Sequence, residues 1–199
     1  MPKLRILPFA AAFAFASLAQ AAAPGTPAPD FTLTDAAGKP VKLADFRGKH
    51  VVLEWTNPEC PFVRKHYDSA NMQGLQKESA AKDVAWLSIN STNRNHAEFT
   101  TGEEMAAWMG KHGAAPKAVL IDDASTAGRA YAARTTPHMF VIDPSGKIVY
   151  AGAIDDKRSA NPADVKTAKN HVRAALAETL AGKPVTVAST TPYGCSVKY

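Results

Sequence analysis

One short segment carries the residue types needed for thiol chemistry. Cys60 follows an apolar run and is followed directly by Pro61, a residue that favours the first turn of a helix. A cysteine at a helix start faces free backbone N–H groups and the positive end of the helix dipole, which favour thiolate over thiol. Arg64 lies four residues after Cys60, and helical side chains lean toward the N-terminus, so we expect its guanidinium to reach back over the sulfur. The pattern predicts a nucleophile that is active near neutral pH.

Glu54 is an acid within the apolar run that precedes Cys60. On a buried strand its carboxyl would be desolvated and its pKa raised, and it could then accept or return a proton during thiol chemistry. The alternative places Glu54 at the strand end with its side chain in solvent. The sequence favours neither.

A metal site is a weaker possibility. Cys60, His138 and Met139 form a soft ligand set of the kind that binds copper. However, His138 and Met139 are adjacent, and on a strand their side chains would point to opposite faces. We therefore expect no metal ligands and no cofactor.

Composition excludes several classes of protein. The chain has 199 residues, 46% of them hydrophobic, which fits one domain with a sizeable core. Its two cysteines can form at most one disulfide and cannot supply a four-thiolate zinc site. The net charge of +5 is scattered, without a basic stripe, so nucleic acid is not an expected partner.

The first 21 residues have the pattern of a secretory signal peptide. Lys3 and Arg5 precede an apolar run at residues 6–18, which is too short to span a membrane, and residues 19–21 fit signal peptidase. Cleavage near Ala21 predicts a bacterial periplasmic or secreted protein with no membrane association after cleavage.

Strands and helices alternate after a proline-rich lead-in at residues 22–29. The pattern predicts a β-hairpin at 31–34 and 41–43 and further strands at 51–56, 84–90, 118–122, 139–143 and 147–151. Helices are expected at 61–79, 101–112, 125–133 and from the N-cap Asn161 to residue 180. This order predicts an α/β fold with a mixed central sheet and helices on both faces. Residues 30–182 would form this domain, and residues 183–199 a flexible tail that carries Cys195.

The region from Pro27 to about Leu180 resembles the thioredoxin-like superfamily, specifically the peroxiredoxin-like redoxin branch of the alkyl hydroperoxide reductases and the thiol-specific antioxidant proteins. The matching pieces are residues 28–33, the Gly-Lys turn with residues 43–49, the Cys60-Pro61 helix start, and residues 135–137 before 140–143. The resemblance implies a three-layer thioredoxin-like fold and a cis bond before Pro137, which faces the reactive sulfur. It also implies substrate contacts at Asn57, Pro61, Thr136 and Pro137, with Thr136 offering backbone groups to an extended substrate.

Two departures from that family limit what carries over. Val63 stands where a Cys-x-x-Cys motif has its second cysteine. Asn57 and the Pro137-His138 pair stand where peroxiredoxins carry Thr or Ser and Arg. Peroxide binding is therefore less well supported than disulfide exchange.

Cys195 is the only other cysteine, and it follows Pro192 and Gly194. Because Cys60 has no local partner, Cys195 is predicted to resolve it through a reversible intramolecular bridge. A permanent structural bridge between the same two residues is the alternative, since closing so long a loop would stabilise the fold.

The leading prediction is an exported thiol-disulfide oxidoreductase with a redox-active Cys60–Cys195 pair. Its partners would be a protein or small-molecule disulfide and an unidentified thiol reductant. A peroxiredoxin-like thiol peroxidase with an antioxidant role is the first alternative. A non-catalytic or copper-binding protein of thioredoxin fold is the second.

Overall fold

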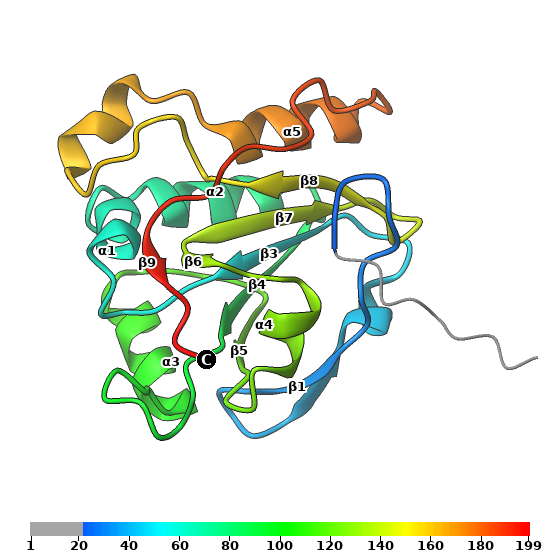
Figure 1. Cartoon of the computed structure of the whole chain (residues 1–199). Helices are drawn as coiled ribbons and strands as arrows, with labels where there is room; N and C mark the ends of the chain where they lie inside the picture. The colour runs from blue at the N-terminus through cyan, green and yellow to red at the C-terminus, as the bar shows by residue number, and fades with distance from the viewer. Residues whose placement is uncertain (1–21) are drawn as a thin grey trace, which may run out of the picture.

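The structure is a computed structural model that describes residues 22–199 (Figure 1). The predicted signal peptide, residues 1–21, lies outside the described residues. None of the helices within residues 22–199 combines the length and the hydropathy needed to cross a bilayer.

A seven-stranded mixed sheet forms the centre of the molecule, in the order β2-β1-β5-β4-β3-β7-β8. Its strands are β1 (Thr32–Asp35), β2 (Pro40–Lys42), β3 (Val51–Trp55), β4 (Ala85–Asn90), β5 (Ala118–Ile121), β7 (His138–Ile142) and β8 (Ile148–Gly152). β3, β4 and β5 pair in parallel, whereas β7 runs antiparallel to β3, and β1 and β2 form the predicted hairpin. The sheet agrees with the predicted fold class.

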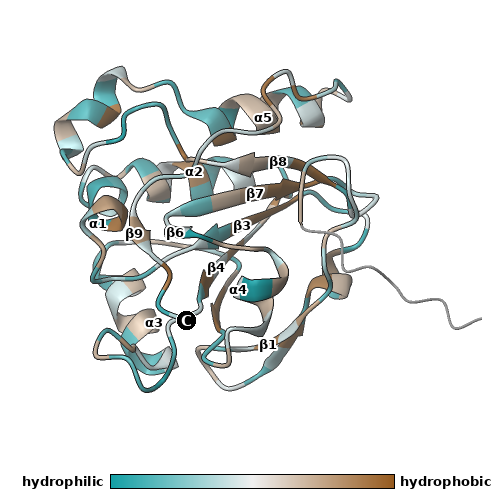
Figure 2. Cartoon of the chain, viewed as in Figure 1, coloured by the Kyte–Doolittle hydropathy of each residue, from teal (hydrophilic) through white to brown (hydrophobic). Residues whose placement is uncertain are grey.

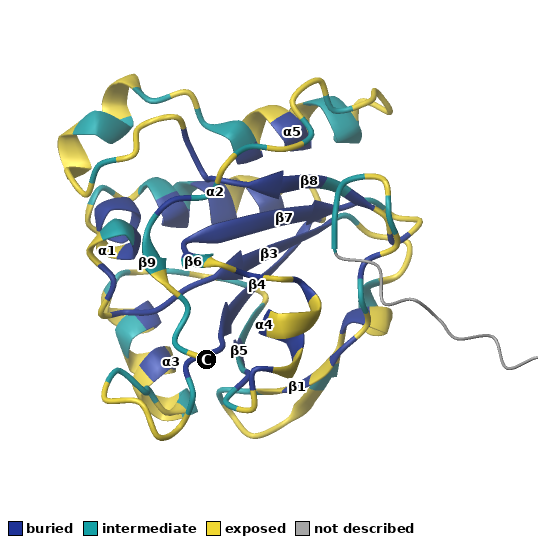
Figure 3. Ribbon diagram, viewed as in Figure 1, coloured by how far each residue is buried: buried dark blue, intermediate teal, exposed yellow. Residues whose placement is uncertain are grey.

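Both faces of the sheet are covered, and β3 shows why. Val52 belongs to a core shared with α1 (Pro61–Asp68), α2 (Asn71–Ala80), α3 (Gly102–Lys111) and α5 (His171–Leu180). Leu53 and Trp55 point into a second core, which contains α4 (Thr126–Ala130) and the 3-10 helix η1 (Leu43–Phe46). A strand buried on both faces is expected to be largely apolar, and β3 is apolar at every position except Glu54. Hydrophobic and buried residues accordingly gather on the central strands (Figures 2 and 3).

Two expected helices are each divided. The helix expected at residues 61–79 is two helices, α1 and α2, because Ala70 adopts the left-handed conformation with φ 58°. The side-chain amide of Gln73 donates to the carbonyl of Tyr67 at 2.8 Å, which satisfies an orphan carbonyl at the end of α1.

The last expected helix is also interrupted. Asn161 caps a 3-10 helix, η2 (Pro162–Thr167), and a second N-cap, Asn170, starts α5 through a 2.8 Å bond to the amide of Arg173. The helical spacing of apolar residues continues across this break, so a prediction from periodicity alone treats the two segments as one helix.

The C-terminal tail, for which the sequence suggested flexibility, is hydrogen-bonded to the sheet at several points. In the tail, the backbone carbonyl of Ala188 accepts a 3.0 Å hydrogen bond from the amide of Ala151. The backbone amide of Thr190 donates a 3.2 Å hydrogen bond to the carbonyl of Ala151. Further on, β9 (Cys195–Ser196) pairs antiparallel with β6 (Thr135–Thr136). The tail therefore crosses the end of the sheet next to α1 (Figure 1).

Candidate active site

Cys60 lies at the junction of β3 and α1, as predicted, and is the N-cap residue of α1. Its side chain is buried, with 1% exposed. The thiol donates to the carbonyl of Thr136, with 2.9 Å between sulfur and oxygen. The Thr136-Pro137 bond is cis, as the resemblance implied. The candidate nucleophile therefore faces the cis-proline loop.

Cys195 reaches the same point from the tail. In the β6–β9 pair it stands directly opposite Thr136, whose carbonyl accepts the Cys60 thiol. The pKa of Cys195 is raised by burial, then by a hydrogen bond with Cys60 and by the charge of Cys60. The structure therefore brings the two predicted cysteines together, and both are free thiols. Whether they form a bridge stays a prediction.

Gly194 makes this approach possible. Its φ is +138°, and a Cβ at this position would lie 2.0 Å from the carbonyl oxygen of Thr136. A side chain there would overlap with the loop, so only glycine lets the tail lie flat against β6.

Glu54 is fully buried on β3, which decides between the two alternatives left by the sequence. Its carboxylate accepts hydrogen bonds of 2.8 Å from the Tyr67 hydroxyl, the Trp86 indole and the Ser88 hydroxyl. Burial raises the pKa of Glu54, and these hydrogen bonds oppose the rise. Tyr67 and Trp86 share one core cluster with Cys60, so the carboxyl lies on the same side of the sheet as the sulfur.

The expected position of Arg64 is wrong. Its guanidinium donates to the carbonyl of Pro58 at 2.7 Å and pairs with Glu59 at 3.1 Å. Of these acceptors, Pro58 is buried and Glu59 is exposed, and the Arg64 side chain remains half-exposed, whereas the sulfur of Cys60 is buried. The hydrogen bonds of Arg64 therefore go to the loop before Cys60 and not to the sulfur.

The predicted substrate-contact residues differ in how free they are to bind a substrate. The Asn57 side chain is engaged within the chain, accepting from the Glu59 amide at 2.7 Å and donating to Thr92 at 3.0 Å. Pro61 is exposed at the start of α1. The backbone edge of Thr136 is already paired with β9, so it is not free to bind a substrate strand as expected.

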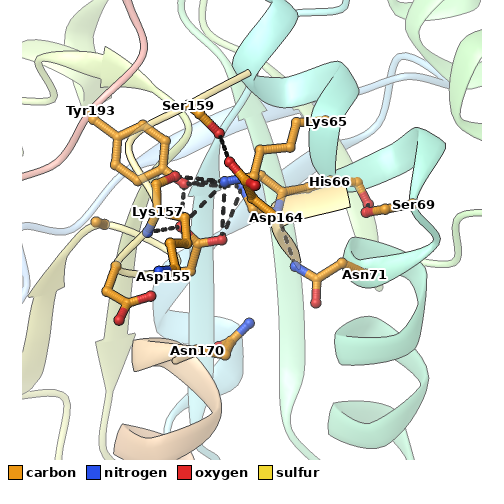
Figure 4. A network of polar contacts seen from close by, with 12 residues as sticks. Lys65, His66, Ser69, Asn71, Asp155, Lys157, Ser159, Asp164, Asn170 and Tyr193 are labelled. Carbon is orange, nitrogen blue, oxygen red and sulfur yellow. Dashed lines mark hydrogen bonds and ion pairs between the residues drawn. The ribbon is translucent and has the colours of Figure 1, made fainter. Parts of the chain in front are cut away.

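Sequence reasoning missed a buried polar network beside the site (Figure 4). The ammonium of Lys65, fully buried, lies 3.2 Å from the Asp155 carboxylate and 3.1 Å from the Tyr193 hydroxyl. A lysine in a short helix normally lies in solvent, so no local signal could have identified this one. Only the nearness of Tyr193 to Cys195 in the chain points toward the site.

The copper ligand set does not assemble. The ring of His138 lies 4.6 Å from that of Phe140, in the second core, whereas Met139 packs with Cys60 in the first. Within residues 22–199, no three His, Cys, Asp or Glu side chains are grouped so that they could hold a metal ion.

Comparison with known proteins identifies similar sequences over most of the domain. The model of the AhpC/TSA family matches residues 24–151. The thiol-disulfide oxidoreductase ResA of Geobacillus thermodenitrificans is 30% identical over 135 residues, covering 64% of this chain and 68% of that protein. ResA of Bacillus subtilis is 30% identical over 132 residues, covering 63% of this chain and 64% of that protein. The match thus spans about two thirds of the length of these relatives.

Solved structures with the same fold extend further along the chain. An uncharacterized conserved protein from Geobacillus kaustophilus has a TM-score of 0.78 and 29% identity, covering 89% of this chain and 93% of its own. A hypothetical protein from Sinorhizobium meliloti has a TM-score of 0.77 and 27% identity, covering 90% of this chain and 96% of its own. A putative thiol:disulfide interchange protein DsbE from Chlorobium tepidum has a TM-score of 0.53 and 25% identity, covering 64% and 83%.

Proposed function

The chain belongs to the AhpC/TSA family, and from this we propose that it is a thiol-disulfide oxidoreductase with Cys60 as nucleophile and Cys195 as resolving cysteine. The relatives named ResA and the thioredoxin-like neighbours support the predicted class of thiol-dependent oxidoreductase. One observation carries the assignment of the pair: β9 sets Cys195 opposite Thr136, the residue whose carbonyl accepts the Cys60 thiol.

The first step of the proposed reaction breaks the substrate disulfide. The Cys60 thiolate attacks one sulfur and forms a mixed disulfide, and the other substrate sulfur leaves as a thiolate that takes up a proton. Before this attack, the Cys60 thiol gives up the proton that it donates to the carbonyl of Thr136.

The second step forms the internal bridge. Cys195 loses its proton and attacks the sulfur of Cys60, and the remaining substrate sulfur leaves as a thiolate. The substrate has then gained two electrons, and the Cys60–Cys195 pair has lost them. A thiol reductant returns the bridge to two thiols by the same exchange.

Glu54 is proposed to influence these proton movements. Its carboxyl is buried, and its hydrogen bonds go to Tyr67, Trp86 and Ser88 and not to a cysteine. Its protonation therefore changes the local field on the Cys60 side of the sheet. We expect Glu54→Gln to slow exchange at Cys60 and to alter its pH profile.

Substrate binding requires the tail to move. Cys60 is 1% exposed, and the edge of Thr136 is occupied by β9. An extended segment of a disulfide-containing protein can pair with Thr136 only after β9 has left, and Asn57, Pro61 and Pro137 would then be its neighbours. The signal-like residues 1–21 support an exported, periplasmic or secreted location for this activity.

Mass spectrometry of non-reduced peptides followed by a redox titration tests the proposal. We expect an intramolecular Cys60–Cys195 bridge with a potential of roughly −120 to −270 mV, the range of known exchange proteins. The single variants Cys60→Ser and Cys195→Ser are the controls and must not form it. A potential below about −300 mV would identify a structural bridge. Intermolecular Cys60 dimers with Cys195 free, or rapid sulfenic acid formation with peroxide, would move the protein toward the peroxidases.

A further inference from the structure

The buried network beside the site is built around a charge pair. The side chains of Lys65 and Asp155 are at most 1% exposed and lie 3.2 Å apart. The Lys65 ammonium also donates to the carbonyl of Lys157 at 2.6 Å. A buried pair is stable only when its remaining donors and acceptors find partners. The network therefore depends on every group that completes it.

Tyr193 is the member contributed by the tail. Its hydroxyl accepts from Lys65 at 3.1 Å and donates to the Asp155 carboxylate (Figure 4). Burial and the Asp155 carboxylate raise the pKa of Tyr193, so the hydroxyl keeps its proton. The ring packs edge-on against Phe62, with 5.9 Å between centroids. Tyr193 is thus held by two charge-assisted hydrogen bonds and by aromatic packing.

The network is connected to both cysteines by short stretches of chain. Cys60 is the N-cap of α1, the helix that carries Lys65 and Phe62. Tyr193 precedes Cys195 by two residues, with Gly194 between them. Fixing Tyr193 against α1 therefore restricts where Cys195 can be relative to Cys60.

We infer that Tyr193 is a positioning residue for the resolving step, anchored by Lys65 and Asp155 so that Cys195 stays beside Cys60. The inference rests on the proposed function, because it concerns how the second thiol is presented. It assigns a role to a buried charge pair that the exchange reaction itself does not use.

Thermodynamic linkage between the Tyr193 anchor and the Cys60–Cys195 bridge gives the direction in which the redox potential should change. The anchor and the Cys60–Cys195 bridge both hold the tail, so each makes the other more favourable. Loss of the Tyr193 hydroxyl should lower the equilibrium constant for bridge formation by about tenfold. For this two-electron couple, a tenfold change makes the potential about 30 mV more oxidising.

The first test is the glutathione equilibrium of Tyr193→Phe in the full chain. This change keeps the ring and its contact with Phe62. Tyr131→Phe is the matched control, since it removes a buried hydroxyl whose 2.8 Å hydrogen bond goes to the carbonyl of Pro29 and not to the tail. We expect the shift in Tyr193→Phe and wild-type values in Tyr131→Phe. Wild-type values in both variants would overturn the inference, whereas a wild-type protein without any bridge would overturn the proposed function.

The first measurement of the second test does not depend on the folding of Tyr193→Phe. In Cys195→Ser, which cannot form the bridge, hydrogen exchange of residues 193–197 should remain protected, because the Tyr193 anchor still holds the tail. Exchange at the rate of an unstructured peptide would overturn the inference. Adding Tyr193→Phe to this background should raise the exchange rate of the tail at least tenfold, and an unchanged rate would also overturn it.

Discussion

At the scale of single residues, Glu54 shows how burial converts an ordinary acid into a pH-sensitive group. The carboxyl has no exposed surface, and desolvation raises its pKa despite three hydrogen bonds. Folded protein therefore retains a proton that the unfolded chain releases at a lower pH. The contribution of Glu54 to stability is fully present below its unfolded pKa and is lost as the pH rises through the folded pKa.

Glu54→Gln should remove this pH dependence. The amide can keep the geometry, with its oxygen facing Trp86 and Ser88 and its NH₂ group donating to Tyr67. Relative to wild type, the variant should gain about 1.4 kcal/mol per pH unit across the window between the two pKa values. Urea unfolding at several pH values from 4 to 8 measures this, with Glu103→Gln on exposed α3 surface as the charge control. Parallel curves for wild type and Glu54→Gln would show that the pKa of Glu54 is not raised.

His138 should act in the opposite direction. Burial and the charge of Arg134 lower its pKa to about 4, so it is neutral in the fold at neutral pH. The unfolded chain binds the proton first, and the contribution of His138 is lost as the pH falls from about 6.5 toward 4, by roughly 3 kcal/mol.

His138→Asn isolates that contribution. The Asn carbonyl can accept the backbone amide of Arg134, which now donates to His138 at 3.3 Å, and it does not titrate. His66, whose pKa is also lowered to about 4, is common to both proteins and cancels. The difference in unfolding free energy should favour the variant increasingly as the pH falls from 6.5 to 4. A constant difference over this range would contradict the assignment.

At the scale of elements, we propose that the short β6–β9 pair controls access to Cys60. It joins two strands of two residues each that are far apart in the chain. The close approach of β9 to the carbonyl of Thr136 depends on Gly194. A short pair of this kind contributes little stability by itself, so it can open more easily than the central sheet. Easy opening is what the proposed reaction requires, because β9 must leave Thr136 when substrate binds and must return for Cys195 to attack.

Gly194→Ala should detach β9. The new Cβ would overlap with the carbonyl of Thr136, so the tail must shift and uncover the thiol. In a Cys195→Ser background we expect iodoacetamide to alkylate Cys60 about tenfold faster, equivalent to about 1.4 kcal/mol of lost pairing. Gly182→Ala is the matched control, since its positive φ of 69° is strained in the same way but no atom lies within 4 Å of the new Cβ. Equal rates in the two variants would show that β9 does not limit access.

At the scale of the whole molecule, a Cys60–Cys195 bridge would link the first third of the chain to its end. In the chain-entropy model, closing so long a loop stabilises a fold by up to about 5 kcal/mol. A bridge that exchanges readily cannot contribute that much, because its stabilisation of the native state equals its extra resistance to reduction.

Oxidised protein should therefore be more stable than reduced protein by clearly less than about 5 kcal/mol. Urea unfolding with and without dithiothreitol measures the difference, and Cys195→Ser should show none. A difference that reaches the full value would identify a structural bridge and contradict the proposed exchange reaction.

Local sequence determined the main features of the fold and the nucleophile. A continuous apolar strand needs helices on both faces, and a cysteine followed by proline begins a helix, so β3, α1 and the position of Cys60 followed from neighbouring residues. The hairpin of β1 and β2 and the capping box of α3 followed in the same way. These features depend on contacts between residues close in the chain.

Tertiary structure alone decided the features that depend on distant segments. The tail pairs with β6, Lys65 is buried against Asp155 and Tyr193, and Glu54 is buried on β3 against α1 and β4. Arg64 is a local exception, since the Pro58 carbonyl and the Glu59 carboxylate that accept from it lie only six and five residues before it. Periodicity records which face of an element is apolar, but it does not record which distant residue covers that face.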